Sequence, residues 1–205
     1  MKGGSVLTHY FKNSENLPHN RKEITFRFLG IFYTLQVDAG VFSKTKPDDG
    51  SLLLVENVLN QTIKGKVLDM GCGYGLISIL LKHQIKDLDV TGIDVNERAI
   101  SCANESAQKM NLDIKFLNQD ILLGYEDVFD SIVTNPPIRA GKKVVYGFFD
   151  YAQRHLNQDG KLFVVIRRQQ GAASAYKALQ ERFKHVERLD LKKGFEILFA
   201  QYPLT

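Results

Sequence analysis

The stretch Val67-Leu68-Asp69-Met70-Gly71-Cys72-Gly73-Tyr74-Gly75 decides the fold. A short apolar run contains an acid near its end, three glycines follow at alternate positions, and a second apolar run begins at Leu76. This pattern predicts a buried strand, a tight loop and a helix. Glycine has no Cβ, so the loop can turn sharply and a ligand can approach its backbone closely. We therefore expect a ligand site where this strand meets the helix.

Strand-like and helix-like segments alternate on either side of this loop. The expected strands are residues 66–70, 88–94, 114–117, 129–134 and 161–166, followed by a closing pair at 186–191 and 195–202. The expected helices cover residues 96–110, 144–156 and 172–183, with one more beginning at Leu76 and an earlier one, capped by Asp49 or Ser51, that includes residues 52–59. This alternation predicts an α/β fold with a doubly wound, mostly parallel sheet. Ligands of such sheets bind beyond the carboxyl ends of the strands.

The N-terminal part of the chain has a different pattern. Two β-like runs, residues 23–29 and 31–37, lie on either side of Gly30 and predict a hairpin. At 205 residues the chain has room for one domain and a small extension. We expect residues 1–46 to form an N-terminal β-hairpin extension that packs on a domain of residues 47–205.

The composition excludes some classes of function but does not identify one. The 27 Lys and Arg against 23 Asp and Glu give a net charge of +4, a mild excess that permits a nucleic-acid partner without requiring one. Cys72 and Cys102 have no metal-ligand spacing, so we expect a reduced cytoplasmic protein and no metal. No secretory signal and no apolar run of membrane-spanning length is visible, so we expect no membrane partner.

Three acids end three successive expected strands. Asp69 and Asp94 end the first two, and Asp120 follows the third. A carboxylate in the position of Asp94 can accept hydrogen bonds from both hydroxyls of a ribose, and Asp120 can reach an adenine amino group. A dinucleotide fold would need a small residue where Leu76 stands, and Asp69 would repel a pyrophosphate, so a cationic ligand fits better. The alternative is that the three acids are unrelated, solvated loop carboxylates. That would account for each acid separately, but not for the presence of one at each of three successive strand ends.

The turn Asn135-Pro136-Pro137 follows the fourth expected strand. Two prolines cannot continue a strand, so they fix the backbone rigidly at the ligand edge. An exocyclic amine conjugated to a ring is a poor nucleophile. The side-chain carbonyl of Asn135 and the backbone carbonyl of Pro136 can accept its two hydrogens and orient its lone pair. A purely structural turn is the alternative, since Asn-Pro commonly begins turns.

Residues 67–75 resemble the first motif of class I S-adenosylmethionine-dependent methyltransferases, and Asp94 and Asp120 match the acids that follow it. The resemblance implies a Rossmann-like, seven-stranded sheet with an antiparallel last strand, and S-adenosylmethionine as the cofactor. It implies that Asp69 and the glycine loop hold the methionine moiety, while Val95 and Ile121 lie beside the adenine. The cofactor-binding residues implied in this way are Asp69, Gly71, Cys72, Gly73, Gly75, Asp94, Val95, Asp120, Ile121 and Asn135.

The turn at residues 135–138 resembles the Asn-Pro-Pro-aromatic signature of methyltransferases that act on amino groups of adenine, cytosine, guanine or protein glutamine. It implies that Asn135, Pro136 and Pro137 are catalytic. The sequence departs from the signature at Ile138, where an aromatic residue usually stacks on the target. Phe42 is our candidate for supplying that stacking from elsewhere in the chain.

Four further segments resemble the "methyltransferase small" domain of bacterial ribosomal RNA guanine-N2 methyltransferases, and in particular their short single-domain members. The segments are residues 38–44, 48–54, 135–142 and 165–172. The resemblance covers nearly the whole chain. It implies methylation of the N2 amino group of a guanine in small-subunit (16S-type) ribosomal RNA, with the RNA or a ribosomal subunit as partner.

Basic residues gather near the expected ligand edge. Arg139, Lys142, Lys143, Arg167 and Arg168 follow the fourth and fifth strands, and Lys44 and Lys46 precede the first helix. Such clustering favours contact with phosphates, although scattered solvated cations are the plain alternative. A base must be unpaired or flipped to reach Asn135, so single-stranded or loop RNA is the expected substrate. The candidate substrate-binding residues are Phe42, Lys44, Ile138, Arg139, Lys142 and Arg168.

Two other interpretations stay open. N5-methylation of a glutamine in a translation release factor would favour an aromatic residue at position 138 and little positive charge at the site. A cofactor-binding module without catalysis would not need Asn135 or the three strand-end acids, and all of them are present.

Overall fold

The computed structural model describes residues 18–39, 41 and 45–205. A seven-stranded sheet forms its centre, with the strand order β5-β4-β3-β6-β7-β9-β8. The strands are β3 (Lys66–Met70), β4 (Asp89–Asp94), β5 (Lys115–Asn118), β6 (Phe129–Thr134), β7 (Leu156–Arg167), β8 (Phe183–Lys192) and β9 (Phe195–Pro203). Strands β3 to β7 pair in parallel, whereas β9 is antiparallel to both of its neighbours. The predicted fold, including the antiparallel last strand, is confirmed.

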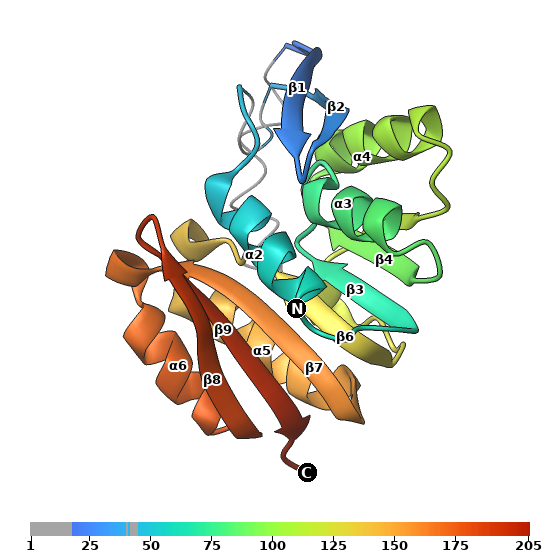
Figure 1. The fold of residues 1–205 in the computed structure, drawn as a ribbon. Coiled ribbons are helices and arrows are strands. Elements are labelled where there is room, and N and C mark those ends of the chain that lie inside the picture. The colour runs from blue at the N-terminus through green and yellow to red at the C-terminus, as the bar shows by residue number, and fades with distance from the viewer. Residues whose placement is uncertain (1–17, 40, 42–44) are drawn as a thin grey trace, which may run out of the picture.

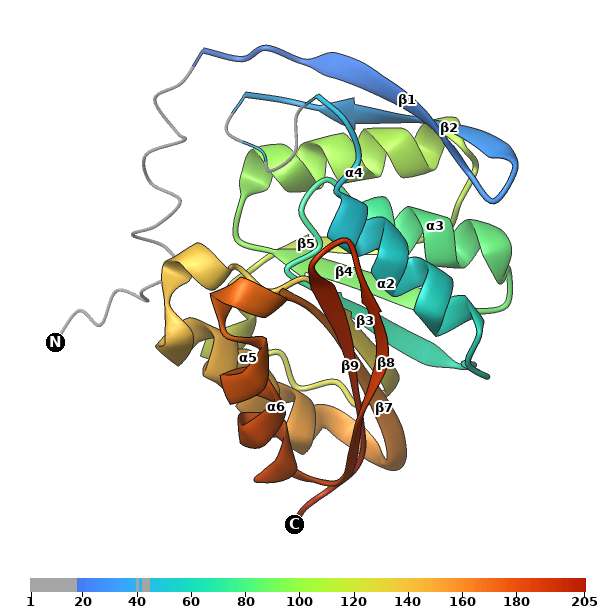
Figure 2. The ribbon, with the colours of Figure 1, turned by 60° about the vertical axis from the view of Figure 1, so that its left-hand side comes forward.

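Helices cover both faces of this sheet (Figures 1 and 2). One face carries α2 (Asp49–Leu59), α3 (Leu76–Gln84) and α4 (Glu97–Lys109), and the other carries α5 (Lys142–His155) and α6 (Ala172–Gln180). Three short 3₁₀ helices, η2 (Ile121–Leu123), η3 (Ile138–Ala140) and η4 (Arg168–Gln170), follow β5, β6 and β7. They therefore lie at the carboxyl edge of the sheet.

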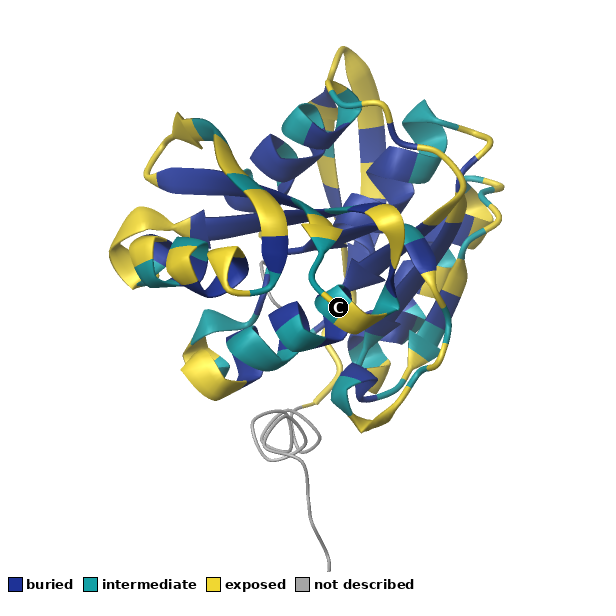
Figure 3. Cartoon of the chain, turned by 90° about the horizontal axis from the view of Figure 1, so that it is seen from below, coloured by how far each residue is buried: buried dark blue, intermediate teal, exposed yellow. Residues whose placement is uncertain are grey.

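Alternate residues of the strands supply two cores. Val67, Val133 and Val165 pack under α2, α3 and α4, whereas Leu68, Ile132 and Val164 pack under α5 and α6. Both faces of the sheet are buried under helices. For this reason the central strands are nearly continuous apolar runs in the sequence. Figure 3 shows these strands as the buried centre of the molecule, with exposed residues on the outer helices and turns.

Several boundaries differ from the expected ones. Helix α2 is capped by Asp48, not by Asp49 or Ser51, because Asp48 has the extended backbone of an N-cap and accepts a hydrogen bond from Ser51 N at 2.7 Å. Helix α6 ends at Gln180 instead of residue 183, since the buried Phe183 already belongs to β8 and pairs with Pro203. Strand β7 begins five residues earlier than expected, directly after α5.

The predicted hairpin is present as a separate two-stranded sheet. Strands β1 (Lys22–Phe28) and β2 (Ile31–Val37) are antiparallel, and Leu29 and Gly30 connect them with positive φ angles of 46° and 85°. Two such residues form the primed turn that suits the twist of a hairpin. The first 17 residues of the expected extension lie outside the described part of the chain.

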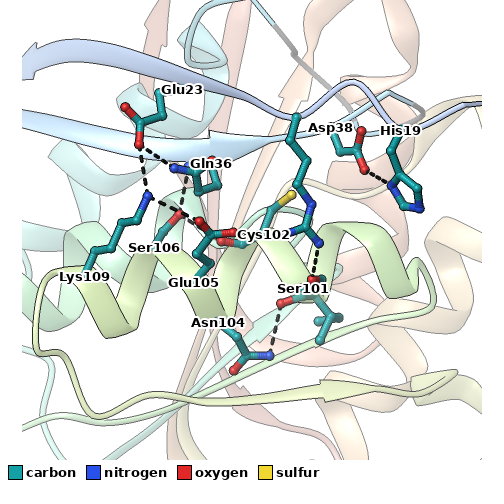
Figure 4. A network of polar contacts seen from close by, with 12 residues as sticks. His19, Glu23, Gln36, Asp38, Ser101, Cys102, Asn104, Glu105, Ser106 and Lys109 are labelled. Atoms are coloured by element: carbon teal, nitrogen blue, oxygen red, sulfur yellow. Dashed lines mark hydrogen bonds and ion pairs between the residues drawn. The ribbon is translucent and has the colours of Figure 1, made fainter.

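The hairpin is attached to α4 by polar contacts (Figure 4). Gln36 N donates to the buried Ser106 Oγ at 2.9 Å, and Lys109 Nζ lies 3.0 Å from Glu23 Oε1. On the apolar side, Tyr33 is buried and its hydroxyl lies 3.0 Å from His83 Nδ1 on α3. The hairpin thus packs over the α3 and α4 side of the domain.

Candidate active site

The three acids lie at one edge of the sheet in the predicted order. Asp69 is the penultimate residue of β3, Asp94 ends β4, and Asp120 follows β5 by two residues. These strands are neighbours and run in parallel, so their carboxyl ends meet at the same edge. The glycine loop begins at this edge, between β3 and α3.

The glycine loop is held by its backbone. Gly71, Gly73 and Gly75 have φ angles of 75°, 55° and 83°, a region that side chains disfavour. The N–H groups of Gly71 and Cys72 donate to Ile93 O at 2.9 and 3.1 Å, which ties the loop to β4. A Cβ at Gly73 would meet nothing within 4 Å, whereas one at Gly75 would lie 2.9 Å from Ala103 Cβ. Gly73 therefore borders open space, and Gly75 allows α3 and α4 to pack closely.

Asp69 is fully buried, and one of its oxygens is free to accept a hydrogen bond. Its Oδ2 accepts from Ser78 N at 3.0 Å and from Ser78 Oγ at 2.6 Å. Its Oδ1 has no hydrogen-bond partner among the described residues. Burial raises the pKa of Asp69 to about 7, the charge of Asp94 adds to this, and the Ser78 hydrogen bonds oppose it. A buried carboxylate oxygen without a donor fits a cationic group such as the amino group of a methionine moiety.

Asp94 and Asp120 also keep acceptor capacity. Asp94 accepts from Gly73 N and Asn96 N, both at 2.8 Å, and a carboxylate oxygen can accept more than one hydrogen bond. Burial raises the pKa of Asp94 against these backbone hydrogen bonds. Asp120 Oδ1 accepts from Leu122 N at 3.0 Å, while its buried Oδ2 has no partner in the described part of the chain. The two carboxylates suit ribose hydroxyls and an adenine amino group.

Val95 and Ile121, the residues expected beside an adenine ring, follow Asp94 and Asp120 directly. Ile121 is buried in the core under α5 and α6, and Val95 packs against that core while partly exposed. Cys72 is 7% exposed, and burial raises the pKa of its thiol well above the usual value. A neutral thiol is a weak nucleophile, which agrees with a small loop residue and not a catalytic one.

Asn135 is oriented by residues that sequence reasoning did not connect to it. Its Nδ2 donates to Asp48 Oδ2 and to Ser51 Oγ, both at 2.9 Å. These contacts occupy both amide hydrogens and leave Asn135 Oδ1 to accept from a ligand. Thr134 is the last residue of β6. Its Oγ1 donates to Met70 O at 2.7 Å and so holds this end of β6 against β3.

The Asn-Pro-Pro turn leads into η3 and α5. Pro136 is buried and Pro137 is the residue before η3. Ile138 is half-buried and packs against the core under α5 and α6. The pattern around Asp48 resembles a helix start, but nothing in it indicates contacts with Asn135, which is 87 positions from Asp48 and 84 positions from Ser51.

The substrate-binding candidates are only partly covered by the structure. Arg139 and Lys142 are exposed after β6 and form no ion pair within the described part of the chain. Arg168, after β7, lies 4.0 Å from the buried Glu196. Because β6 and β7 are adjacent and parallel, all three cations lie at the carboxyl edge. Phe42 and Lys44 lie outside the described residues.

The described residues form neither a metal-binding cluster nor a membrane-spanning helix. No group of three His, Cys, Asp or Glu side chains there could hold a metal ion. No helix in the same part of the chain is long and apolar enough to cross a membrane. The histidines of α3 and α5 have structural contacts: His83 meets Tyr33, and His155 Nδ1 lies 2.9 Å from Asp127 O.

Comparison with known proteins identifies the family. The methyltransferase small domain matches residues 32–199. The chain belongs to this family. It is an S-adenosylmethionine-dependent methyltransferase, and the unpartnered oxygens of Asp69 and Asp120 and the open side of Gly73 fit that cofactor.

Three relatives place the chain within the family. The uncharacterized protein YbxB of Bacillus subtilis (strain 168) is 39% identical over 196 residues, covering 94% of this chain and 98% of YbxB. Ribosomal RNA small subunit methyltransferase C of Haemophilus influenzae (strain PittEE) is 35% identical over 130 residues, 62% of this chain and 39% of that protein. The T. thermophilus 16S rRNA N2 methyltransferase RsmC, solved with AdoMet and guanosine, is 29% identical with a TM-score of 0.80. That match covers 90% of this chain and 51% of the T. thermophilus chain.

Proposed function

We propose that this methyltransferase methylates the exocyclic N2 amino group of a guanine in small-subunit ribosomal RNA. The observation that carries the proposal is the Asn135 amide, whose two hydrogens are used within the protein and whose oxygen is left as an acceptor at the carboxyl edge. An acceptor that cannot rotate into a donor suits a target that brings two N–H hydrogens.

In the proposed reaction, one group of residues binds the cofactor and another orients the target amine. When bound, S-adenosylmethionine supplies an electrophilic methyl group. Asp69 and the glycine loop would hold its methionine moiety, Asp94 its ribose, and Asp120 its adenine between Val95 and Ile121. Asn135 Oδ1 and the Pro136 carbonyl accept the two hydrogens of the target amine, so its lone pair is directed at the methyl group. The prolines keep these two acceptors in place.

The nucleic-acid part of the proposal rests on charge and on relatives. Arg139, Lys142 and Arg168 place positive charge at the edge where the amine must enter, which suits phosphate contacts. RsmC of T. thermophilus, the solved relative described above, was captured with guanosine. A flipped or unpaired guanine in the cytoplasmic ribosomal RNA is the substrate that combines both features. Ile138 lacks the aromatic ring that would favour a glutamine substrate.

The test is methyl transfer to RNA from cells that lack the gene. Labelled S-adenosylmethionine is incubated with the enzyme and either extracted total RNA or intact small subunits, and the RNA is then digested to nucleosides. We expect label in N2-methylguanosine from small-subunit RNA. Label in another nucleoside, or label only in the glutamine of a release factor offered in parallel, would overturn the proposal.

A further inference from the structure

We propose that Asp48 and Ser51 are positioning residues of the methyl-transfer site: they clamp the Asn135 amide so that its oxygen faces the target amine. The inference rests on the proposed role of Asn135 and deepens it. It concerns two residues at the start of α2 to which the proposed function assigns no contact with S-adenosylmethionine or with the target amine. They act through Asn135.

The contacts determine which way the amide points. A carboxylate can only accept hydrogen bonds, so the group that lies 2.9 Å from Asp48 Oδ2 must be the NH₂ of Asn135. Ser51 Oγ, also at 2.9 Å, accepts the second hydrogen. A flipped amide would place its oxygen against the carboxylate and lose both bonds. The clamp therefore selects one of the two amide orientations, the one that presents Oδ1 as acceptor.

The start of α2 is itself held in place. Asp48 Oδ2 accepts from Ser51 N at 2.7 Å as the N-cap, so one carboxylate oxygen fixes both the helix and the amide. Behind it, a Cβ at Gly50 would come within 2.6 Å of the Phe195 ring, so the helix start packs directly on β9. Lys193 Nζ reaches Asp49 Oδ1 at 3.1 Å from the β8–β9 turn. The clamp is therefore supported by β9 and by the β8–β9 turn.

The charge of Asp48 also belongs to the site. The target amine gains positive charge as it is methylated, and a carboxylate bonded to Asn135 polarises the amide so that its oxygen becomes a better acceptor. Tyr74 of the glycine loop is a close neighbour. Burial, and then the charge of Asp48, raise the pKa of its hydroxyl. Asp48 thus lies between the glycine loop and the catalytic turn.

The test compares alanine variants at neighbouring positions of one helix start. Asp48→Ala removes one acceptor and Ser51→Ala the other. The matched control is Asp49→Ala, which loses contacts with Lys46 and Lys193 but does not touch Asn135. Single-turnover methyl transfer is measured at saturating RNA and cofactor, well below the unfolding temperature, with S-adenosylhomocysteine affinity from calorimetry.

We expect Asp48→Ala to slow transfer by roughly 10- to 100-fold, as for loss of a hydrogen bond to a charged group. Ser51→Ala should slow it less, and Asp49→Ala should stay near the wild-type rate. Cofactor affinity should be unchanged in all three. Asp48→Asn keeps a cap and an acceptor oxygen but loses the charge, so it should recover only part of the rate lost in Asp48→Ala.

The decisive comparison uses the Asn135→Ala background. If Asp48 acts through Asn135, Asp48→Ala should add little to the loss already caused by Asn135→Ala, so the two effects are not additive. Additive effects, or a wild-type rate in both Asp48→Ala and Ser51→Ala, would overturn the inference. Failure of the proposed function is a different result, because then wild-type enzyme itself would put no label into guanine.

Discussion

At the scale of single residues, Asp69 combines burial with an acceptor oxygen that has no donor among the residues that the structure describes. Its pKa of about 7 lies above the ordinary value of 3.8 that applies in the unfolded chain. Between about pH 4 and pH 7 the unfolded state therefore loses this proton first, while the folded state still binds it. This group makes the free energy of unfolding fall as pH rises through that range. The decrease ends once the folded carboxyl has ionised.

The first prediction follows from that sign. Asp69→Asn removes the titration, so the stability of the variant relative to wild type should increase from pH 4 to pH 7, by on the order of a few kcal/mol. Urea unfolding of both cofactor-free proteins at several pH values measures this difference, in which the titrating groups that do not interact with Asp69 cancel. A difference that does not change with pH would mean that Asp69 titrates normally in the folded protein.

Asn135 is the residue on which the proposed chemistry depends. The Asn135→Ala enzyme should bind S-adenosylhomocysteine like wild type but transfer methyl roughly 10²- to 10³-fold more slowly, as for loss of another preorganised polar group. Single-turnover rates at saturating cofactor and RNA measure the effect. Asn157→Ala is a matched control. Asn157 lies at the start of β7, is exposed, and donates a hydrogen bond to Asp130 of β6. Equal rates in the Asn135 variant and wild type would leave the turn as scaffolding.

The sequence predicts the acids and Asn135 because each follows directly from a local pattern, a buried strand with a polar residue near its end. It does not predict the Asp48–Asn135 contact, since that depends on how α2 packs across the sheet, 87 residues away along the chain. Both expected caps of α2, Asp49 and Ser51, were wrong, since the cap is Asp48. Asp48 and Asp49 have the same side chain, and only the backbone conformation separates the cap from the first helical residue. The roles of Phe42 and Lys44 stay predictions.

At the scale of elements, the bounds of β3 and β6 were predicted better than those of β7 and β8, each of which begins earlier than expected. β6 has the expected bounds, and five of its six residues are buried. The amphipathic edge strand β8 starts at Phe183, three residues before its expected first residue. There the buried Phe183 fits the end of a helix as well as the start of a strand, and only its pairing with Pro203 decides.

The hairpin is the element whose relation to the rest the sequence cannot give. We propose that it is an extension docked on the domain of residues 47–205, held chiefly where β2 meets α4. Gln36 N is buried against Ser106 Oγ, so Ser106→Ala should leave an N–H without an acceptor and lower stability by about 1–3 kcal/mol. Urea unfolding gives the change. Hydrogen exchange should show faster exchange in β1 and β2.

Ser101→Ala is the control for this prediction. Ser101 lies on the same helix, but its contact with Arg21 Nη2 is exposed, so the change should stay within about 0.5 kcal/mol. Equal losses in the two variants would show that the buried hydrogen bond between Gln36 N and Ser106 Oγ has no special part in holding the hairpin.

At the scale of the whole molecule, the fold separates a ligand edge from a structural edge. The net charge of +4 is too small to direct the protein to RNA by itself. What matters is where the cations lie. Arg139 and Lys142 follow β6 at the carboxyl edge, whereas Lys86 and Lys184 precede β4 and begin β8 at the opposite edge. Two pairs of exposed cations of equal charge thus lie at opposite edges of the sheet.

The last prediction uses these two pairs. Each phosphate contact with a single strand contributes roughly 0.7 to the slope of log affinity against log salt, because binding releases condensed counterions. Replacing Arg139 and Lys142 together with alanine should therefore make the slope shallower by up to about 1.4 if both touch phosphates. Replacing Lys86 and Lys184 removes the same net charge at the far edge and should leave the slope close to that of wild type. Equilibrium binding of small-subunit RNA over a salt series measures all three slopes. If both double variants change the slope equally, only net charge matters and RNA has no preferred edge. If neither variant changes the slope, these cations do not contact the RNA backbone.

A change confined to the Arg139 and Lys142 variant would place the RNA over the Asn-Pro-Pro turn, where the proposed chemistry requires it.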